Sequence, residues 1–245
     1  MKTDPSMPTE EILLVDGYAV GGTLQDGIDG NYDFSISDVI KEAWQKTDGV
    51  KGTFWAALII AIIGIPVGIF VITLAISILL GMPASLIQII PYLVQIVLFI
   101  ILLPFIVGII MIAVRRSVEL PVRFSIIFDY FGYTIPIVIA FLLTNLLVTI
   151  GLMALLIPGY YLLIAYFCTL PLIVEKNLGP WEAMEASRKA VTHHWFKVFF
   201  TFLFMSLIVI ISAIPFGIGL IWTLPMIFNV QGILYRIMFG VEEVM

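Results

Sequence analysis

Charged residues are scarce in this sequence. Only 12% of its 245 residues are Asp, Glu, Lys or Arg, and 61% are hydrophobic, whereas soluble domains carry about 25% charged and about 45–50% apolar residues. The scarcity is uneven, because residues 1–53 hold 10 of the 17 acids while long stretches after Phe54 carry no charge. A soluble core would interrupt such runs with polar faces, so the runs indicate a lipid environment.

Cysteine and histidine are also rare. Cys168 is the single cysteine and has no partner for an internal disulfide. His193 and His194 are adjacent, so on a helix they point about 100° apart and cannot share a metal without a bend. Neither Cys168 nor Ser187 has a base and an orienting acid at a recognisable spacing. The sequence therefore predicts no catalytic residue, no cofactor and no metal. An intramembrane enzyme, the weakest alternative, would need both histidines to converge with acids.

Three long blocks carry no charge: residues 54–114, 134–174 and 198–235. Even the shorter ones would make helices of about 60 Å, twice the ~30 Å hydrocarbon core. Each contains helix-breaking residues near its middle, at 81–83, 158–159 and 215–217, so each is expected to turn back. The first block follows an acidic segment, which is unlike a cleavable signal peptide.

The predicted fold is thus all-α, a polytopic membrane bundle of six transmembrane helices in three hairpins. The spans are expected at about 54–80, 86–114, 134–157, 159–174, 198–214 and 218–238, and a re-entrant segment within 54–80 is the main rival. None of the twelve bases lies in the three central turns. The positive-inside rule then predicts a multi-pass protein of the bacterial inner membrane with both termini and both long loops in the cytoplasm.

An amphipathic segment precedes each hairpin, at about 35–48, 120–131 and 179–193. Such helices lie flat at the headgroup level, with aromatic side chains inserted and bases against anionic lipid. This repeat divides the chain into a flexible acidic tail, 1–33, and a membrane domain, 34–245, with residues 31–34 as an anchoring clamp. It predicts a lipid or partner interface at Trp44, Arg115, Arg116, Arg123, Trp181, Arg188, Lys189, His193, His194 and Trp195.

The predicted spans contain no ionisable residue in their interiors, which argues against an ion-coupled carrier. Their main polar side chains are Gln95, Asn145, Asn229 and Gln231. We expect them to form hydrogen bonds between helices, each worth about 0.6–2 kcal/mol. The alternative is a substrate path, which would require a deep polar cavity lined by Gln95, Asn145 and Asn229.

The stretch from Pro158-Gly159-Tyr160-Tyr161 through Pro171-Leu172-Ile173-Val174-Glu175, Gly179-Pro180-Trp181-Glu182-Ala183 and Ser187-Arg188-Lys189 to His194-Trp195 resembles a known group. Tyr235-Arg236 and the earlier Gly217-Ile218-Gly219 also fit. The group comprises bacterial integral membrane proteins that include the YciC-like proteins and are related to the membrane domain beside some glycerophosphoryl diester phosphodiesterases. The resemblance covers residues 158–236. It implies a six-helix bundle in a bacterial inner membrane. It does not imply phosphodiesterase activity, because the soluble catalytic barrel and its metal-binding acids are missing here.

Two functions follow from these patterns. The first is a non-enzymatic membrane protein that organises lipid or partner proteins at the cytoplasmic leaflet. The alternative is a transporter or flippase-like protein for an uncharged or amphiphilic substrate. The expected partners are membrane lipids and a membrane or cytoplasmic protein; the sequence has no basic stripe for nucleic acid and leaves homo-oligomerisation open.

Overall fold

The computed structural model describes residues 20–49, 51–79 and 89–242. Within these ranges the chain is helical apart from turns and one isolated β-bridge. Six segments are long and apolar enough to cross a membrane, so the all-α polytopic fold is confirmed. These segments are Lys51–Ile78, Tyr92–Ser117, Phe124–Ala154, Leu156–Glu175, Trp195–Ala213 and Leu220–Phe239.

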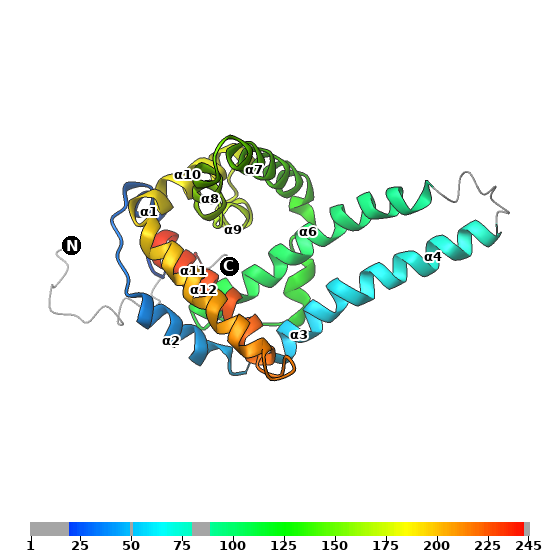
Figure 1. Ribbon diagram of the computed structural model, residues 1–245, viewed down its shortest axis with the longest axis horizontal. Coiled ribbons are helices and arrows are strands. Elements are labelled where there is room, and N and C mark those ends of the chain that lie inside the picture. Colours follow the sequence, from blue (N-terminus) through cyan, green and yellow to red (C-terminus); the bar gives the residue numbers. More distant parts are fainter. Residues whose placement is uncertain (1–19, 50, 80–88, 243–245) are drawn as a thin grey trace.

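The first hairpin consists of α3 (Lys51–Ile59), the π-helical turn η1 (Ile60–Gly64), α4 (Ile65–Leu79) and α6 (Ile90–Ser117). Helix α4 and the N-terminal part of α6 form an arm that extends away from the other helices, whereas the C-terminal part of α6 packs within the bundle (Figure 1). Only 6% of an apolar 18-residue stretch within Lys51–Ile78 is buried by the rest of the protein. The segment is one continuous helix, so a re-entrant path over its described part is wrong. The predicted turn at 81–83 lies outside the described residues.

A proline explains the π-helical turn in this arm. Pro66 has no N–H, so the carbonyl of Ile62 loses its regular partner four residues later. The neighbouring Ile65 N–H bonds to the carbonyl of Ile60, five residues back, and the helix absorbs the interruption as a π-bulge.

The interfacial helix predicted at 120–131 is wrong. The structure has two short 3-10 helices there, η2 (Phe124–Phe128) and η3 (Phe131–Tyr133). Ile127 is fully buried, and a Cβ added to Gly108 of α6 would lie 2.6 Å from the Ile127 Cα atom. The backbone of η2 thus packs directly on α6, and the segment does not form the amphipathic α-helix that was predicted.

The second hairpin turns earlier than predicted. Helix α7 (Thr134–Ala154) ends and α8 (Leu156–Ala165) begins on either side of Leu155, which is extended at φ −159° and ψ 139°. Pro158 therefore lies in the first turn of α8, where its missing N–H removes no helical hydrogen bond. The turn predicted at 158–159 is corrected to residue 155.

The fourth span is broken between α8 and α9 (Thr169–Glu175). A buried serine from α10 (Pro180–His193) bridges the break. The Ser187 hydroxyl donates to the Ala165 carbonyl at 2.7 Å and accepts from the Cys168 N–H at 3.2 Å. Backbone groups freed inside a membrane protein need such partners, which explains how the break is tolerated.

The third hairpin contains α11 (Trp195–Ala213) and α12 (Leu220–Phe239), close to the predicted bounds. Phe216, at the tip between them, is fully exposed with a φ of +52°. Helix α12 is central to the bundle and packs against α6, α2 (Ile36–Thr47) and α11. A Cβ added to Gly232 would lie 2.5 Å from the backbone of Ala113, so α12 and α6 cross with their backbones in close approach.

The predicted tail 1–33 needs a correction for residues 20–33. Helix α1 (Leu24–Asp29) begins with a reciprocal capping box between Thr23 and Asp26, and Val20 forms an antiparallel bridge with Val241. These residues are ordered because α1 packs against α10 and α12. Residues 1–19 of the predicted tail lie outside the described residues.

Candidate functional site

Most ion pairs of the described chain lie at one end of the bundle. This base-bearing end comprises α1, α2, α10 and the C-terminal turns of α6, α9 and α12, together with the segment 30–35 that links α1 to α2. Helices α2 and α10 have the bounds predicted for two of the three amphipathic segments. The contacts at this end show which of the predicted interface side chains are exposed and which are bonded within the protein.

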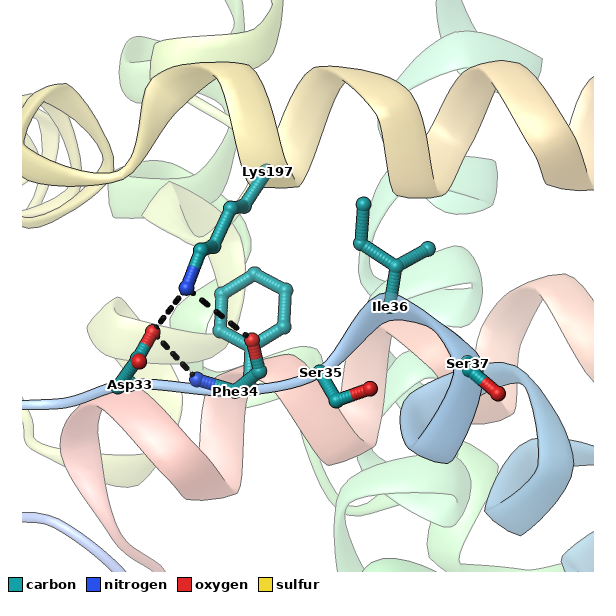
Figure 2. A pocket seen from close by; sticks show the side chains of 6 residues that line it. All are labelled: Asp33, Phe34, Ser35, Ile36, Ser37 and Lys197. Atoms are coloured by element: carbon teal, nitrogen blue, oxygen red, sulfur yellow. Dashed lines mark hydrogen bonds and ion pairs between the residues drawn. The ribbon is translucent and has the colours of Figure 1, made fainter.

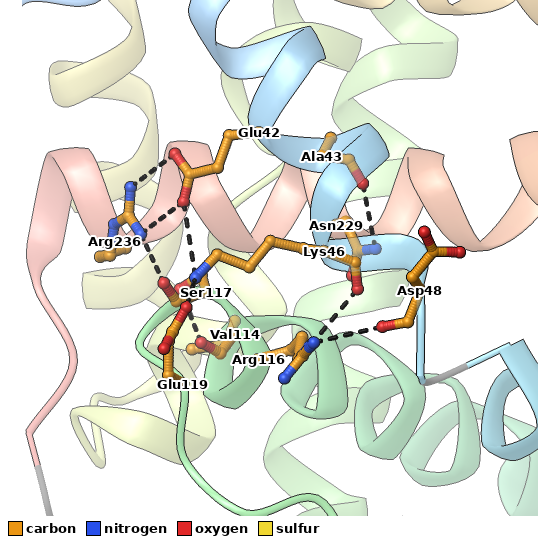
Figure 3. A network of polar contacts seen from close by, with 10 residues as sticks. All are labelled: Glu42, Ala43, Lys46, Asp48, Val114, Arg116, Ser117, Glu119, Asn229 and Arg236. Atoms are coloured by element: carbon orange, nitrogen blue, oxygen red, sulfur yellow. Dashed lines mark hydrogen bonds and ion pairs between the residues drawn. The ribbon is translucent and has the colours of Figure 1, made fainter.

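One guanidinium joins three helices at this end (Figure 3). Arg236 of α12 contacts Glu42 of α2 through two parallel hydrogen bonds of 2.8 and 2.9 Å, and it also donates to the Ser117 carbonyl at the end of α6. Both side chains of the pair are less than a third exposed. Two-pronged charged contacts of this kind are stronger than single neutral hydrogen bonds. Arg236 therefore fixes α2 against the bundle.

A second group of contacts surrounds the C-terminus of α2. Lys46 lies 3.0 Å from Glu119 in the loop after α6, and this hydrogen bond lowers the pKa of the Glu119 carboxyl. Arg116 donates to the carbonyls of Lys46 at 3.4 Å and Asp48 at 3.2 Å (Figure 3). A cation at a helix C-terminus satisfies carbonyls that have no intrahelical partner. Arg116, predicted to meet lipid, is thus used within the protein.

A third group joins α9 to the C-terminus of the described chain. Both oxygens of Glu175 accept hydrogen bonds, from the Tyr235 hydroxyl at 2.6 Å and from the Glu242 N–H at 2.8 Å. Lys176 lies 2.7 Å from Glu242 and 3.4 Å from Glu175. The adjoining Val241 forms the bridge to Val20, so this cluster also positions the start of the described N-terminal segment.

Both histidines hold the segment between α1 and α2. The His193 Nε2 atom lies 3.1 Å from the Ile28 carbonyl, and the His194 ring packs edge-on against Tyr32 with centroids 4.9 Å apart. The Tyr32 hydroxyl donates to the Ala190 carbonyl at 2.8 Å, and burial raises its pKa. Residues 31–34 therefore clamp this segment, as hypothesised from the sequence, and His193 and His194 serve the clamp.

A shallow open depression of about 600 Å³ lies beside this clamp (Figure 2). Lys197 of α11 forms an ion pair with Asp33 at its wall and lowers the pKa of that carboxyl mainly through the hydrogen bond. The remaining lining comes from the start of α2, residues 34–37. Because its one cation is already paired, the depression offers little to hold an anion.

The structure separates the predicted interface residues into exposed and internally paired ones. Trp44 on α2 and Trp181 on α10 are 51% and 62% exposed. Arg123 is exposed and forms no ion pair within the described chain, and Lys189 is exposed 3.6 Å from Glu185. The remaining predicted cation of α10, Arg188, pairs with the same Glu185 at 2.7 Å, and Trp195 of α11 donates to the Tyr161 carbonyl at 3.3 Å. Arg115 is half-buried.

Two of the four predicted intramembrane polar residues bond to distant segments, one to α2 and one to the break between α8 and α9. Asn229 is buried and donates to Thr47 at 3.1 Å, and Gln231 donates to the Phe167 carbonyl at 2.9 Å. Asn145 differs from expectation because it bonds to the Phe141 carbonyl of its own helix. Gln95 is exposed. Asn229 faces α2 while Gln95 and Asn145 face outward, so these residues do not line the common cavity that a transport path requires.

The sequence did not predict the acids that pair with bases at the base-bearing end. Glu42, Glu119 and Glu175 each lie within a few residues of a base that flanks an apolar run. An acid close in sequence to such a base could therefore have been identified as a member of an ion pair. The sequence does not indicate which helix supplies the base that pairs with it. Among the described residues no group of three His, Cys, Asp or Glu side chains is arranged to hold a metal.

Comparison of the chain with protein-family models, with curated proteins and with solved structures finds no significant match. The geometry of the base-bearing end is therefore the basis for a functional conclusion.

Proposed function

We propose that this integral membrane protein is a non-enzymatic organiser of anionic lipid at the cytoplasmic leaflet of a bacterial inner membrane. The observation that carries the proposal is that α2 and α10 each bury one face on the bundle and expose a tryptophan and a lysine. On α2 these are Trp44 and Lys41, and on α10 they are Trp181 and Lys189. Aromatic and cationic side chains together suit the headgroup layer.

The internal ion pairs support this proposal indirectly. Arg236, Arg116 and Lys46 hold α2 in place, so the exposed face of that helix is presented by a rigid support. Each base near an anionic membrane surface contributes about 1 kcal/mol of attraction. Because the support is rigid, the exposed bases keep fixed positions and their contributions add at one patch of the leaflet. The YciC-like resemblance, which stays a prediction, is compatible with the same membrane.

Lipid selectivity in reconstituted bilayers tests the proposal. The protein is placed in phosphatidylcholine membranes, and the association constants of spin-labelled phosphatidylglycerol and phosphatidylcholine are compared by electron paramagnetic resonance. We expect phosphatidylglycerol to associate severalfold more strongly, with a preference that falls as salt rises. Combining Lys41→Gln, Arg123→Gln and Lys189→Gln should bring the ratio toward one.

Glu182→Gln is the matched control, because it removes an exposed charge of the opposite sign from α10. This variant should keep or raise the preference for phosphatidylglycerol. Equal association of both lipids with the wild-type protein would overturn the proposal, and selective capture of a protein by the same face would favour a partner-organising role.

A further inference from the structure

Helix α7 exposes a polar side chain in the middle of a transmembrane segment. Asn145 is the twelfth of the 21 residues of α7 and is exposed. At a rise of 1.5 Å per residue it lies about 14–17 Å from either end of the helix. An asparagine side chain is too short to reach the headgroup layer from that depth. Gln95, which is also exposed, is instead the fourth residue of its span and lies close to a boundary. Asn145 therefore faces the hydrocarbon core.

The amide of Asn145 is only partly satisfied. Its Nδ2 atom donates to the Phe141 carbonyl of the same helix at 2.8 Å. This bond uses one of the two N–H groups, and the second N–H and the Oδ1 atom form no hydrogen bond with the described residues. Lipid chains offer neither a donor nor an acceptor, so unmatched polar groups at this depth are costly. The amide thus needs a partner that both donates and accepts inside the membrane.

The side chains on either side of Asn145 belong to one uncovered face of α7. Leu142 is 55% exposed and Thr149 is exposed, and residues three and four apart lie on the same side of a helix. We call Leu142, Asn145 and Thr149 the Asn145 face. On the opposite side Ile137 and Ala140 are fully buried, where α7 packs against α6, α8 and α10. Figure 1 shows α7 at the rim of the bundle.

We propose that two copies of this chain associate in the membrane through the Asn145 face. Copies inserted in the same direction carry Asn145 at the same depth, and a two-fold axis along the membrane normal brings each Asn145 opposite its counterpart. The Oδ1 atom of each then accepts from the free N–H of the other, so a second copy supplies the donor and the acceptor by symmetry alone. Such polar pairs bind helices together in membranes and fix the register of helix pairs. This inference goes beyond the proposed lipid function and does not depend on it.

Single-molecule photobleaching in bilayers measures the association. The full-length protein carries one fluorescent protein at its C-terminus and is reconstituted at decreasing protein-to-lipid ratios. We expect a reversible dimer, and we expect Asn145→Leu to weaken dimerisation about tenfold because both hydrogen bonds are lost. Asn145→Gln, which keeps the carboxamide, should stay within about threefold of the wild-type protein. Gln95→Leu is the matched control, because it removes an exposed carboxamide near a boundary, and it should change dimerisation by less than about twofold.

Cysteine cross-linking in native membranes locates the contact. Leu142→Cys should form a disulfide-linked dimer on oxidation, because it lies one turn from Asn145 on the proposed contact. Ile210→Cys is the control, since Ile210 of α11 is 62% exposed on a different helix, and it should stay monomeric. The native Cys168 is buried and does not interfere. This experiment keeps Asn145 itself, so it remains informative if Asn145→Leu does not fold.

A wild-type protein that is monomeric at every protein-to-lipid ratio would overturn the proposal, and so would equal dimerisation of the wild-type protein and Asn145→Leu. Cross-linking through Ile210→Cys and not through Leu142→Cys would move the contact to α11 and equally overturn the Asn145 face. Cross-linking of Leu142→Cys to a different protein alone would assign the face to that protein and exclude a second copy. None of these results changes the spin-label ratio, so failure of the dimer and failure of the proposed function are separate outcomes.

Discussion

The buried polar contacts of this protein are carried by a few side chains, each of which joins elements distant in sequence. Arg236 is the strongest case, because it bonds to Glu42 across 194 residues and to the end of α6. On the same helix, Asn229 bonds to Thr47 of α2 and Gln231 bonds to the Phe167 carbonyl in the break between α8 and α9. Removing one member of such a contact leaves the other partly desolvated and unpaired, which costs more than the contact itself contributes.

Arg236→Gln should lower the free energy of unfolding by about 2 kcal/mol, the typical value of a hydrogen bond to a charged group. Glu42→Gln should have a similar effect, and the double variant should cost less than the sum of both. Unfolding in mixed micelles measures these values, with the exposed Lys41→Gln as the control. Strict additivity of the two changes would show that Arg236 and Glu42 do not interact.

At the scale of elements, the hairpins depend on irregular segments that other elements stabilise. The π-helical turn in the first span accommodates Pro66, and the 3-10 helices η2 and η3 pack directly on α6. The break between α8 and α9 depends on α10 through Ser187. Helix α10 is therefore a structural part of the bundle as well as a surface helix.

Ser187→Ala should lower the free energy of unfolding by about 1–3 kcal/mol, because it leaves the Ala165 carbonyl and the Cys168 N–H without their buried partner. Ser206→Ala is the control, since Ser206 is exposed and bonds only within α11. Hydrogen exchange in micelles should also speed up at residues 165–169 in the Ser187 variant alone. Equal stability of the two variants would contradict the bridging role.

At the scale of the whole molecule, most ion pairs collect at one end, while the Lys51 ammonium lies 5.2 Å from the ring centroid of Trp222, at the start of α12. The base-bearing end ties α1, α2, α10 and both ends of the described chain together through ion pairs and the Val20 to Val241 bridge. The tip between α11 and α12 instead exposes Phe216 completely.

Labelling of intact cells tests the orientation. Phe216→Cys should react with a membrane-impermeant maleimide added outside the cell, whereas Lys189→Cys should react only after lysis. The wild-type protein is its own control, because its single cysteine, Cys168, is buried and should stay unlabelled. Labelling of both variants from the same side would contradict the six-span arrangement with cytoplasmic bases.

The uncharged blocks and their flanking bases determined the fold class, the six spans and the bounds of α2, α10, α11 and α12 to within a few residues. This information is local, because hydropathy and amphipathic spacing act on neighbouring residues. Tertiary structure decided the features that depend on distant partners. Ile127 packing at Gly108 produced 3-10 helices where the pattern predicted an interfacial helix, and α10 and α12 ordered residues 20–33.

The same distinction applies to the functional site. The sequence predicts bases and tryptophans at one membrane boundary, and in the structure Trp44 and Trp181 are exposed. Which bases are free could not be predicted, because Arg116 and Arg236 find their acceptors on helices far away in sequence. The sequence by itself determined where long uncharged segments alternate with charged ones, since charge cannot enter the hydrocarbon core cheaply. Only the folded chain decided that Arg123 forms no ion pair among the described residues, because pairing depends on which side chains packing brings within reach.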